Sequence, residues 1–448
     1  MASIVVVGGG VAGLTCAWRL VRAGHDVEVL ESEATAGGRM RSEREGDYLL
    51  ERGARLVTSG YRGFHGVAGL LGLEGAIQPL AGSGNAVFHN GRFEDADWAD
   101  SRRILRSPLL SLGAKLRLGR LAVELLRHRD VLDPLRPERA AGLDVEDAAG
   151  YLARIAGVEA RDEWIGPMLS ATFDSDIESL SSAFVLLVLR LALGDSQLQA
   201  MHGGLGRFTA ALAREVSVRT DCLVSSVETE TDGARVRYRV GGREGREGSV
   251  VADAAVVAVP GTAVAELCPK LTPRERGFFE GMRYTRGIVA HLLLDEAPAA
   301  LTHCGVAFPR RPGSDLYGLA AEHCKGGAAP PGAGLLRATL SEAATSRVWG
   351  AADGEVAGLV LDNLSRTPLG SLSPRKVVVH RWPAMLPHFA PGHLQGLTGF
   401  LGRADRSARL AFCGDYLVGP YVEGALTSGM RAASEVVRSL SDDPHQGL

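Results

Sequence analysis

The chain has 448 residues, of which 46% are hydrophobic and 23% charged, a balance typical of a globular protein rather than a disordered or fibrous one. This length exceeds one ordinary hydrophobic core, so we expect two or more domains. The 49 basic and 52 acidic residues give a net charge of −3, which disfavours nucleic-acid binding because no basic surplus can follow a phosphate backbone.

The first thirty residues predict a strand, a helix and a second, parallel strand. Residues 3–7 form a β-branched run typical of a buried strand, and apolar residues recur at helical spacing over residues 11–23. Gly24 ends that helix, and residues 27–30 form the next strand. A unit of this size predicts an α/β fold with a parallel sheet.

Later segments change character. Residues 104–200 are rich in helix, residues 216–259 switch to the period of two that predicts short strands, and residues 424–440 form a final helix. The helical segment 109–127 carries basic residues among leucines. It either lies on a membrane surface or, as is more usual, covers a neighbouring helix, so membrane contact is an option that the pattern does not favour.

The cysteines, histidines and N-terminus define the expected compartment. Six scattered cysteines form no C-x-x-C pair and the twelve histidines show no metal-ligand spacing, so we expect neither a disulfide-stapled fold nor a metal site. No basic lead-in or cleavage site precedes the first apolar run, and residues 183–193, the longest apolar stretch, are too few to span a bilayer. A cytoplasmic protein is the expected class.

Three glycines stand between the first strand and the first helix in the pattern Gly8-x-Gly10-x-x-Gly13. Gly8 permits a tight turn, Gly10 lets the backbone approach a pyrophosphate, and Gly13 allows the helix to pack closely on the strand. This pattern predicts a dinucleotide site because it has the strand and helix that the motif requires on either side.

The elements beside this turn extend the predicted site. Val11 and Ala12 begin the helix, whose free N–H groups and positive dipole end face the phosphates. Glu31 closes the second strand directly before Ser32. A carboxylate there can accept hydrogen bonds from both ribose hydroxyls and would repel a 2′-phosphate, which argues against NADP. NAD and FAD both fit these residues.

The segments that follow decide between those two cofactors. Residues 33–39 read Glu-Ala-Thr-Ala-Gly-Gly-Arg, residues 51–56 read Glu-Arg-Gly-Ala-Arg-Leu, and the far end contains Phe-Cys-Gly-Asp and Tyr-Val-Glu-Gly-Ala at 412–415 and 421–425. In this order they resemble the flavin amine oxidase superfamily, which includes monoamine and polyamine oxidases, protoporphyrinogen oxidase and phytoene desaturase. The pattern is most similar to protoporphyrinogen oxidase-like members. The resemblance implies FAD and extends over the whole chain, although the middle matches loosely.

The resemblance assigns cofactor contacts to particular positions. Arg39, after Gly38, would reach the pyrophosphate, and Asp415, after Gly414, would bind the ribityl–phosphate chain. The helix beginning near Gly424 would direct its positive end at the flavin C2 carbonyl and stabilise reduced flavin. The other implied contacts are Gly53, Ala54, Arg55, Leu56, Val224, Trp382, Val422 and Ala425.

Several of these positions keep a second interpretation. Val224 is either a backbone contact to adenine or simply part of a buried strand, and Trp382 is taken as a wall near the flavin rather than a reactive group. No tyrosine or cysteine stands near residues 385–387, where monoamine oxidases have a second cage ring and a covalent flavin link, so non-covalent FAD is expected. The strand predicted at 286–294 also lacks the lysine that many amine oxidases place near flavin N5, and His291 there either handles protons or is a satisfied strand histidine.

We predict an α/β fold in which a Rossmann-type FAD-binding domain is interleaved with an α+β substrate domain of mixed sheet and helices. The FAD-binding domain comprises residues 1–80, 200–268 and 395–448. The substrate domain comprises residues 81–199 and 269–394.

The implied activity is an FAD-dependent oxidase that moves hydride from a C–H of an amine-containing or cyclic biosynthetic intermediate to flavin N5, with molecular oxygen as the expected acceptor. The alternatives are protoporphyrinogen oxidase proper, an isoprenoid or carotenoid-type desaturase, and a flavin-binding scaffold without turnover.

Arg55 and Tyr421 are the predicted catalytic side chains. Arg55 would grip a substrate carboxylate or carbonyl unless it pairs with Glu51 or another carboxylate, and Tyr421 would lie beside the reacting carbon unless it is only pocket wall. Substrate identity and oligomeric state stay open.

Overall fold

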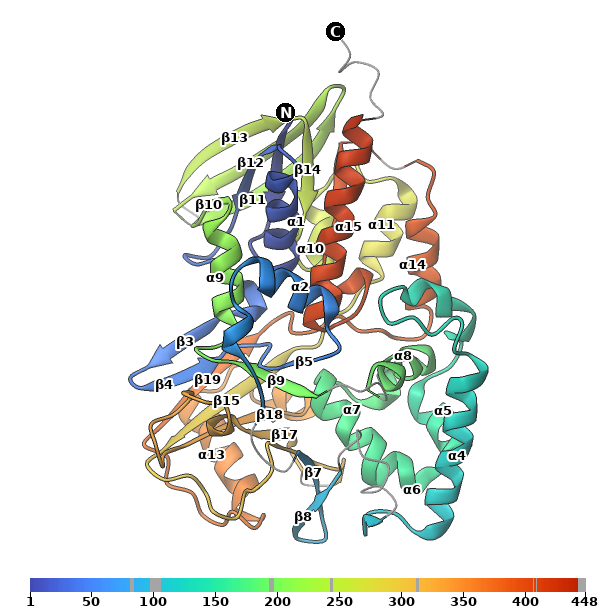
Figure 1. Cartoon of the computed structure of the whole chain (residues 1–448), viewed down its shortest axis with the longest axis vertical. Coiled ribbons are helices and arrows are strands. Elements are labelled where there is room, and N and C mark those ends of the chain that lie inside the picture. The colour runs from blue at the N-terminus through green and yellow to red at the C-terminus, as the bar shows by residue number, and fades with distance from the viewer. Residues whose placement is uncertain are drawn as a thin grey trace.

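The computed structural model describes residues 1–80, 84–96, 106–192, 197–241, 245–311, 314–405, 407 and 409–441. Figure 1 shows the two chain ends and the long helix α15 in the upper part, a sheet at lower left and a group of helices at lower right. The site described below is built where these three parts meet.

The upper part is organised by a five-stranded parallel sheet of order β10-β2-β1-β14-β20. Its strands are β1 (Ser3–Val7), β2 (Asp26–Leu30), β10 (Ser217–Arg219), β14 (Ala254–Val257) and β20 (Leu410–Phe412). Segments from the N-terminus, the middle and the C-terminus therefore share one sheet. This topology confirms the predicted α/β class with a parallel nucleotide-binding sheet.

Helices and smaller strands surround this sheet. Figure 1 shows α1 (Val11–Arg22) beside α15 (Val422–Ser441), and α9 (Gly206–Arg214) also contacts α1. A three-stranded antiparallel sheet consists of β11 (Cys222–Glu230), β12 (Gly233–Val240) and β13 (Arg246–Ala252). The remaining elements near the upper part are η1 (Gly38–Met40), β3 (Ser42–Glu45), β4 (Tyr48–Glu51), β5 (Val57–Thr58), α2 (Arg62–Leu70), β6 (Ile77–Pro79), β9 (Leu198–Met201), α10 (Gly261–Leu267) and α11 (Pro273–Glu280).

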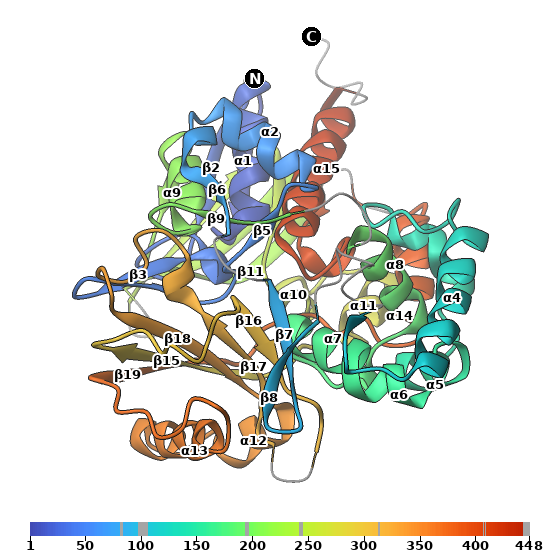
Figure 2. The same ribbon diagram turned by 60° about the horizontal axis from the view of Figure 1, so that its bottom comes forward.

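The lower sheet has seven strands in the order β19-β15-β18-β17-β16-β7-β8. They are β7 (Asn85–His89), β8 (Arg92–Asp95), β15 (Gly287–Leu294), β16 (Gly305–Ala307), β17 (Leu316–Ala321), β18 (Gly334–Leu340) and β19 (Lys376–Trp382). One face is apolar and packs against α12 (Glu342–Arg347) and α13 (Asp353–Ser365), as Figure 2 shows. The other face carries His291 and Arg337, which stand opposite each other in the register of β15 and β18. Because α12 and α13 cover only the apolar face, the face with His291 and Arg337 is turned towards the rest of the molecule.

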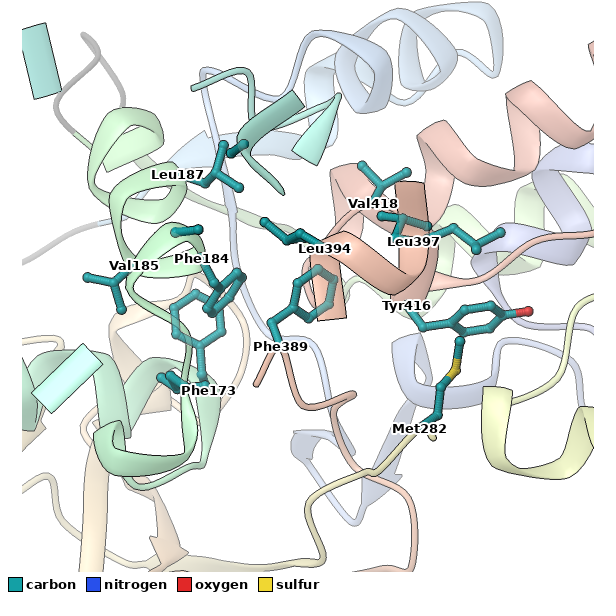
Figure 3. Packing of buried hydrophobic residues seen from close by; sticks show 14 of the residues in the cluster. Phe173, Phe184, Val185, Leu187, Met282, Phe389, Leu394, Leu397, Tyr416 and Val418 are labelled. Carbon is teal, nitrogen blue, oxygen red and sulfur yellow. The ribbon is translucent and has the colours of Figure 1, made fainter. Parts of the chain in front are cut away.

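The helical group contains α4 (Leu112–Arg127), α5 (Ala148–Ile155), α6 (Val158–Ala160), η4 (Arg161–Ile165), α7 (Gly166–Phe173) and α8 (Ser182–Ala192). Figure 3 shows how an aromatic core joins this group to α14 (His393–Leu401) and η7 (Asp415–Leu417). The Phe389 ring lies 4.9 Å from that of Phe184 and 4.3 Å from that of His393. Tyr416, in η7, is fully buried in the same core. This packing holds the C-terminal motif against the helices.

Helix α4 has two apolar faces. Ala114, Leu121 and Leu125 are buried, so one face does cover its neighbours. A second set of apolar side chains on α4 is exposed, namely Leu112 (74%), Leu116 (73%), Val123 (60%) and Leu126 (67%). Within the described residues, no helix combines the length and apolar character needed to cross a bilayer.

The predicted division into two discontinuous domains stays a prediction. The parallel sheet falls in the segments 1–80, 200–268 and 395–448, and the seven-stranded sheet falls in 81–199 and 269–394. Separate sheets support that division, while α14 at the start of the last segment packs with the helical group.

The contact between α1 and α15 generates a stability prediction. A Cβ atom added to Gly429 would lie 2.2 Å from the Ala12 carbonyl oxygen. We expect Gly429→Ala to destabilise the protein by about 1–3 kcal/mol because rigid backbone must move. Gly358→Ala in α13 is the control, since its Cβ would meet nothing within 4 Å and alanine favours helix by about 0.5–1 kcal/mol. Equal thermal unfolding temperatures for the two variants would contradict this prediction.

Candidate functional site

The glycine-rich turn has the geometry of a phosphate cradle. Gly8 has a φ of +106°, and a Cβ there would lie 2.7 Å from the Ala258 carbonyl oxygen. A Cβ on Gly13 would lie 2.1 Å from the Gly8 carbonyl oxygen, whereas one on Gly10 would meet nothing within 4 Å. Space therefore lies beside Gly10 at the N-terminus of α1, where Val11 and Ala12 present the first helical N–H groups.

Glu31 is held rigidly at the carboxyl end of β2. Its side chain is buried, with Oε2 accepting the Gly9 N–H at 2.7 Å and Oε1 accepting the Glu33 N–H at 2.8 Å. The exposed Ser32 hydroxyl donates to Oε1 at 3.2 Å. Val224 is buried in β11, two residues after Cys222. The Cys222 N–H donates to the Glu31 carbonyl, and this hydrogen bond places the start of β11 beside Glu31. The arrangement offers a fixed anionic acceptor to a ribose.

Arg39 and Asp415 form a two-pronged ion pair between the two ends of the sequence. Nη1 of Arg39 lies 2.7 Å from Oδ2 of Asp415, and Nη2 lies 3.0 Å from Oδ1. Nη1 also donates to the Met385 carbonyl oxygen at 2.8 Å. Burial alone would lower the pKa of Arg39, but the Asp415 carboxylate reverses this effect and raises that pKa. The guanidinium therefore stays charged where a pyrophosphate would lie.

The loop that contains Gly53 and Ala54 is fastened to the same arginine. Ala54 N–H donates to the Arg39 carbonyl at 2.9 Å, and a Cβ on Gly53 would lie 2.3 Å from that oxygen. Trp382 at the end of β19 borders the loop, since its Nε1 donates to the Arg52 carbonyl at 2.9 Å. Gly38, with a φ of +53°, and the half-buried Leu56 flank these contacts. The Gly53–Ala54 loop and Trp382, both predicted to lie near the flavin, are therefore neighbours.

The C-terminal motif leads into the N-terminus of α15. Gly414 N–H donates to the Ser428 hydroxyl at 2.8 Å, which ties the turn before Asp415 to the helix. A Cβ on Gly424 would lie 2.3 Å from the Gly419 carbonyl oxygen, so the first turn of α15 requires glycine for its close approach. Val422 and Ala425 are buried beside it. The positive end of the helix dipole is therefore set next to the Arg39–Asp415 pair.

The structure places Tyr421 against a second ring that the sequence did not reveal. Its ring stacks on Tyr61 with centroids 6.1 Å apart and an angle of 27°. The Tyr421 hydroxyl donates to the Pro134 carbonyl at 2.6 Å. These contacts favour the interpretation that Tyr421 forms a wall of the site rather than a reacting group. Tyr61 lies outside the motifs, so no pattern pointed to it.

Arg55 pairs with a carboxylate, and the partner is not Glu51. Nη1 of Arg55 lies 3.4 Å from Oε1 of the fully buried Glu322, which also binds Lys325. Burial would raise the pKa of Glu322, but Lys325 and Arg55 hold it at about 2. Glu51 instead accepts hydrogen bonds from the Ser42 hydroxyl and the Leu205 N–H. Arg55 is 26% exposed and keeps donors beyond Nη1 for a ligand.

One further side chain near the site, Tyr284, was missed by sequence reasoning, and another, His291, was left with two interpretations. Tyr284 lies under the Arg39 guanidinium, 5.7 Å from ring centroid to Cζ, and accepts the Gly261 N–H at 3.1 Å. His291 is completely buried in β15, and neither of its ring nitrogens has a hydrogen-bond partner among the described residues. Burial, with Arg337 nearby, lowers the pKa of His291 to about 3. Neither residue belongs to a spaced motif that could have identified it.

A parallel sheet with a phosphate cradle, joined to a second sheet with a polar face, defines a dinucleotide-dependent oxidoreductase. The family described as flavin-containing amine oxidoreductase matches residues 11–437. The chain belongs to this family, which confirms the predicted FAD-dependent oxidoreductase class. Glu31, Gly10 and Arg39 fit FAD, because they offer a ribose acceptor, room for a pyrophosphate and a cation beside it.

Individual relatives are distant but cover the whole chain. Coproporphyrinogen III oxidase of Staphylococcus aureus is 22% identical over 483 residues, which covers 98% of this chain and 99% of that protein. A putative protoporphyrinogen oxidase from Exiguobacterium sp. 255-15 has a TM-score of 0.76 at 19% identity, and putrescine oxidase bound to putrescine has 0.78 at 19%. Each alignment covers 98% of this chain and 99% of the other chain. The two structures show a shared fold.

The cofactor contacts generate a test of FAD retention. We expect Glu31→Ala and Asp415→Ala each to lower FAD occupancy, because a charge-assisted hydrogen bond contributes about 1.5–3 kcal/mol. Occupancy is measured from FAD in the supernatant after acid precipitation, and non-covalent binding predicts that the released flavin is intact. Glu355→Ala, on the exposed side of α13, is the control. Full occupancy in both variants, with flavin retained in the pellet, would contradict the assignment.

Proposed function

We propose that the protein is an oxidase of a carboxylate-bearing, nitrogen-containing biosynthetic intermediate, with a porphyrinogen-type tetrapyrrole as the first candidate and molecular oxygen as the electron acceptor. The observation that carries this proposal is the cationic Arg55 held beside the Gly53–Ala54 loop, which the Arg39 carbonyl ties to the cofactor cradle. The full-length similarity to coproporphyrinogen III oxidase supports the tetrapyrrole candidate.

The chain's own residues would bind and orient rather than supply a base. FAD, when bound, supplies the hydride acceptor. Arg39 and Asp415 would hold its phosphate and ribityl portions, and Trp382 and Tyr421 would exclude water at the edges of the site. Arg55 would grip a substrate carboxylate through the donors that Glu322 does not occupy.

The other candidate functions fit this geometry less well. A carotenoid-type desaturase needs an apolar tunnel, whereas the sheet face near the cofactor residues carries His291, Arg337 and the Arg55–Glu322 pair. A simple amine oxidase of the monoamine type uses a lysine near N5, and β15 contains none. A scaffold without turnover would not need a cation such as Arg55 beside the Gly53–Ala54 loop.

The proposal is tested by anaerobic mixing with porphyrinogens, amines and polyenes while flavin absorbance is followed. We expect porphyrinogens to bleach the flavin and air to restore it. Arg55→Ala should slow reduction at least tenfold, or about 1.4 kcal/mol of transition-state stabilisation, with an unchanged flavin spectrum. Carboxylate esters of the substrate should be poor substrates for the native protein and insensitive to that change. Arg44→Ala, exposed on β3, is the control.

We also propose that α4 lies on an anionic membrane surface. Leu112, Leu116, Val123 and Leu126 recur at helical spacing and form one exposed stripe. At 100° per residue, Lys115 stands on one side of the stripe and Arg120 and Arg127 on the other. Basic side chains that flank an exposed apolar stripe match a headgroup boundary, whereas two such basic helices would repel each other in a dimer.

A vesicle assay tests this contact. The flavin-loaded protein should sediment with phosphatidylglycerol-containing vesicles, more weakly with phosphatidylcholine alone, and less as salt increases. Replacing Leu116 and Val123 together by Glu should reduce binding about tenfold or more. Val251→Glu is the matched control because Val251 is also exposed, at 52%, but lies on β13. If the native protein and the variant with Glu at positions 116 and 123 bind the vesicles equally, α4 is not the membrane contact.

A further inference from the structure

Charged side chains from three separate parts of the chain meet at the polar face of the seven-stranded sheet. Arg337 comes from β18, Asp174 directly follows α7, and Arg55 follows the cofactor loop. A Cβ added to Gly318 in β17 would lie 3.1 Å from the Cβ of Ala171 in α7, so the helix that ends before Asp174 packs on this sheet. A Cβ added to Gly305 in β16 would lie 3.8 Å from Nη2 of Arg55, and Gly305 and Arg337 both pair with Ala320 of β17. No motif links these positions, and neither Asp174 nor Arg337 has a part in the proposed function so far.

Asp174 is held in an unusual position. It has φ 49° and ψ 43°, the left-handed conformation, at the C-terminal end of α7. The residue is only 8% exposed, and its Oδ1 has no hydrogen-bond partner in the part of the chain that the structure describes. Burial raises the pKa of Asp174 to about 6, although Arg337 and Arg55 oppose that rise. A buried carboxylate oxygen without a donor is costly and therefore needs an explanation.

Arg337 has a matching deficit. The residue is 7% exposed, its Nη1 donates to the Thr339 hydroxyl at 3.0 Å, and its Nε has no hydrogen-bond partner within the described ranges. Burial lowers the pKa of Arg337, while Asp174 counteracts that effect. Among the described residues, no ion pair within 4.0 Å joins Asp174 to Arg337 or Arg55. An acceptor and a donor of opposite charge are thus both left open in one place.

This place lies on the side of the sheet that faces the cofactor residues. Arg39 donates to the Met385 carbonyl, and the Met385 side chain packs on Gly287, where an added Cβ would lie 1.8 Å from its sulfur. Gly287 and His291 are on the same strand and the same face, and His291 stands opposite Arg337. The open donor of Arg337 therefore shares a face of the sheet with the wall of the cofactor site, and α7, which ends directly before Asp174, packs against β17 of the same sheet.

We propose that Asp174 and Arg337 form a substrate-recognition pair, in which the Asp174 carboxylate accepts a hydrogen bond from a substrate N–H and the Arg337 guanidinium donates to a substrate carboxylate. Arg55 is the second cation available to such a substrate. The inference rests on the proposed function and specifies its substrate class as compounds with both an N–H and a carboxylate near the oxidised carbon. A hydrocarbon substrate would satisfy neither group.

Asp174→Asn is the sharpest variant because asparagine tolerates the left-handed backbone and keeps the shape of the side chain. Asp221→Asn is the matched control, since Asp221 has φ 51° but is exposed. We expect Asp174→Asn to raise KM and lower kcat/KM at least tenfold, with FAD occupancy and thermal unfolding temperature unchanged. N-methylation of the substrate should impose a similar loss on the native protein and little further loss on this variant.

The pH profile separates recognition from a structural role. The carboxylate form accepts the N–H, so kcat/KM of the native protein should rise as pH increases through about 6, and Asp174→Asn should lack this rise. The groups facing Asp174 are Arg337 from β18 and Arg55 from the cofactor loop, and α7 also packs on β17, where Tyr317 binds Asp176. These arginines and this tyrosine keep their charge states near pH 6.

Arg337→Gln provides an independent arm if Asp174→Asn fails to fold. That variant should lose at least tenfold in kcat/KM with the carboxylate substrate and little with its ester. Native protein whose flavin is reduced by no compound bearing an N–H and a carboxylate would overturn both the proposed function and this inference. Flavin reduction that is equal in native protein, Asp174→Asn and Arg337→Gln, with the same pH profile, would overturn the inference alone.

Discussion

The ion pair between Arg39 and Asp415 is the constraint on which the rest of the site depends. It joins the segment after β2 to the segment after β20, and the same arginine binds the Met385 carbonyl and receives the Ala54 N–H. Four stretches of chain therefore meet at one residue. Because Asp415 is buried, loss of Arg39 would leave the Asp415 charge uncompensated, so these stretches must assemble together for that carboxylate to be stable.

The seven-stranded sheet beside that junction has two unlike faces, and the polar one carries the groups proposed to bind substrate. Alternate residues of β15 and β18 pack in an apolar cluster against α12 and α13. The residues between them include His291 and Arg337, which face away from that cluster. The strand β15 contains a single polar residue in an otherwise apolar run, so its pattern indicates burial on both faces. The structure agrees, because the face of β15 that turns away from α12 and α13 is also buried, against other parts of this chain.

Several predicted positions acquire their meaning only from partners that are remote in the sequence. For Arg55 the sequence left open a grip on a substrate carboxylate or carbonyl and a salt bridge with Glu51 or another carboxylate, and the structure pairs it with Glu322. Tyr421 has a stacked partner in Tyr61 instead of a ring near residues 385–387. The apolar residues of α4 divide into a buried and an exposed face, which composition alone did not distinguish. In each case the deciding contact is non-local, and short-range pattern carries no information about it.

The sequence by itself determined the nucleotide-binding half of this protein. Gly8, Gly13 and Glu31 could be predicted because their roles depend on local geometry: a positive φ, a close helix–strand approach and the end of a strand. The matched segments at both ends of the chain likewise indicated the flavin family. Only the tertiary structure brought together the proposed recognition pair, since Asp174 and Arg337 come from a helix end and a strand in different parts of the chain. Their proximity results from long-range packing, and no local pattern or spacing in the sequence predicts it.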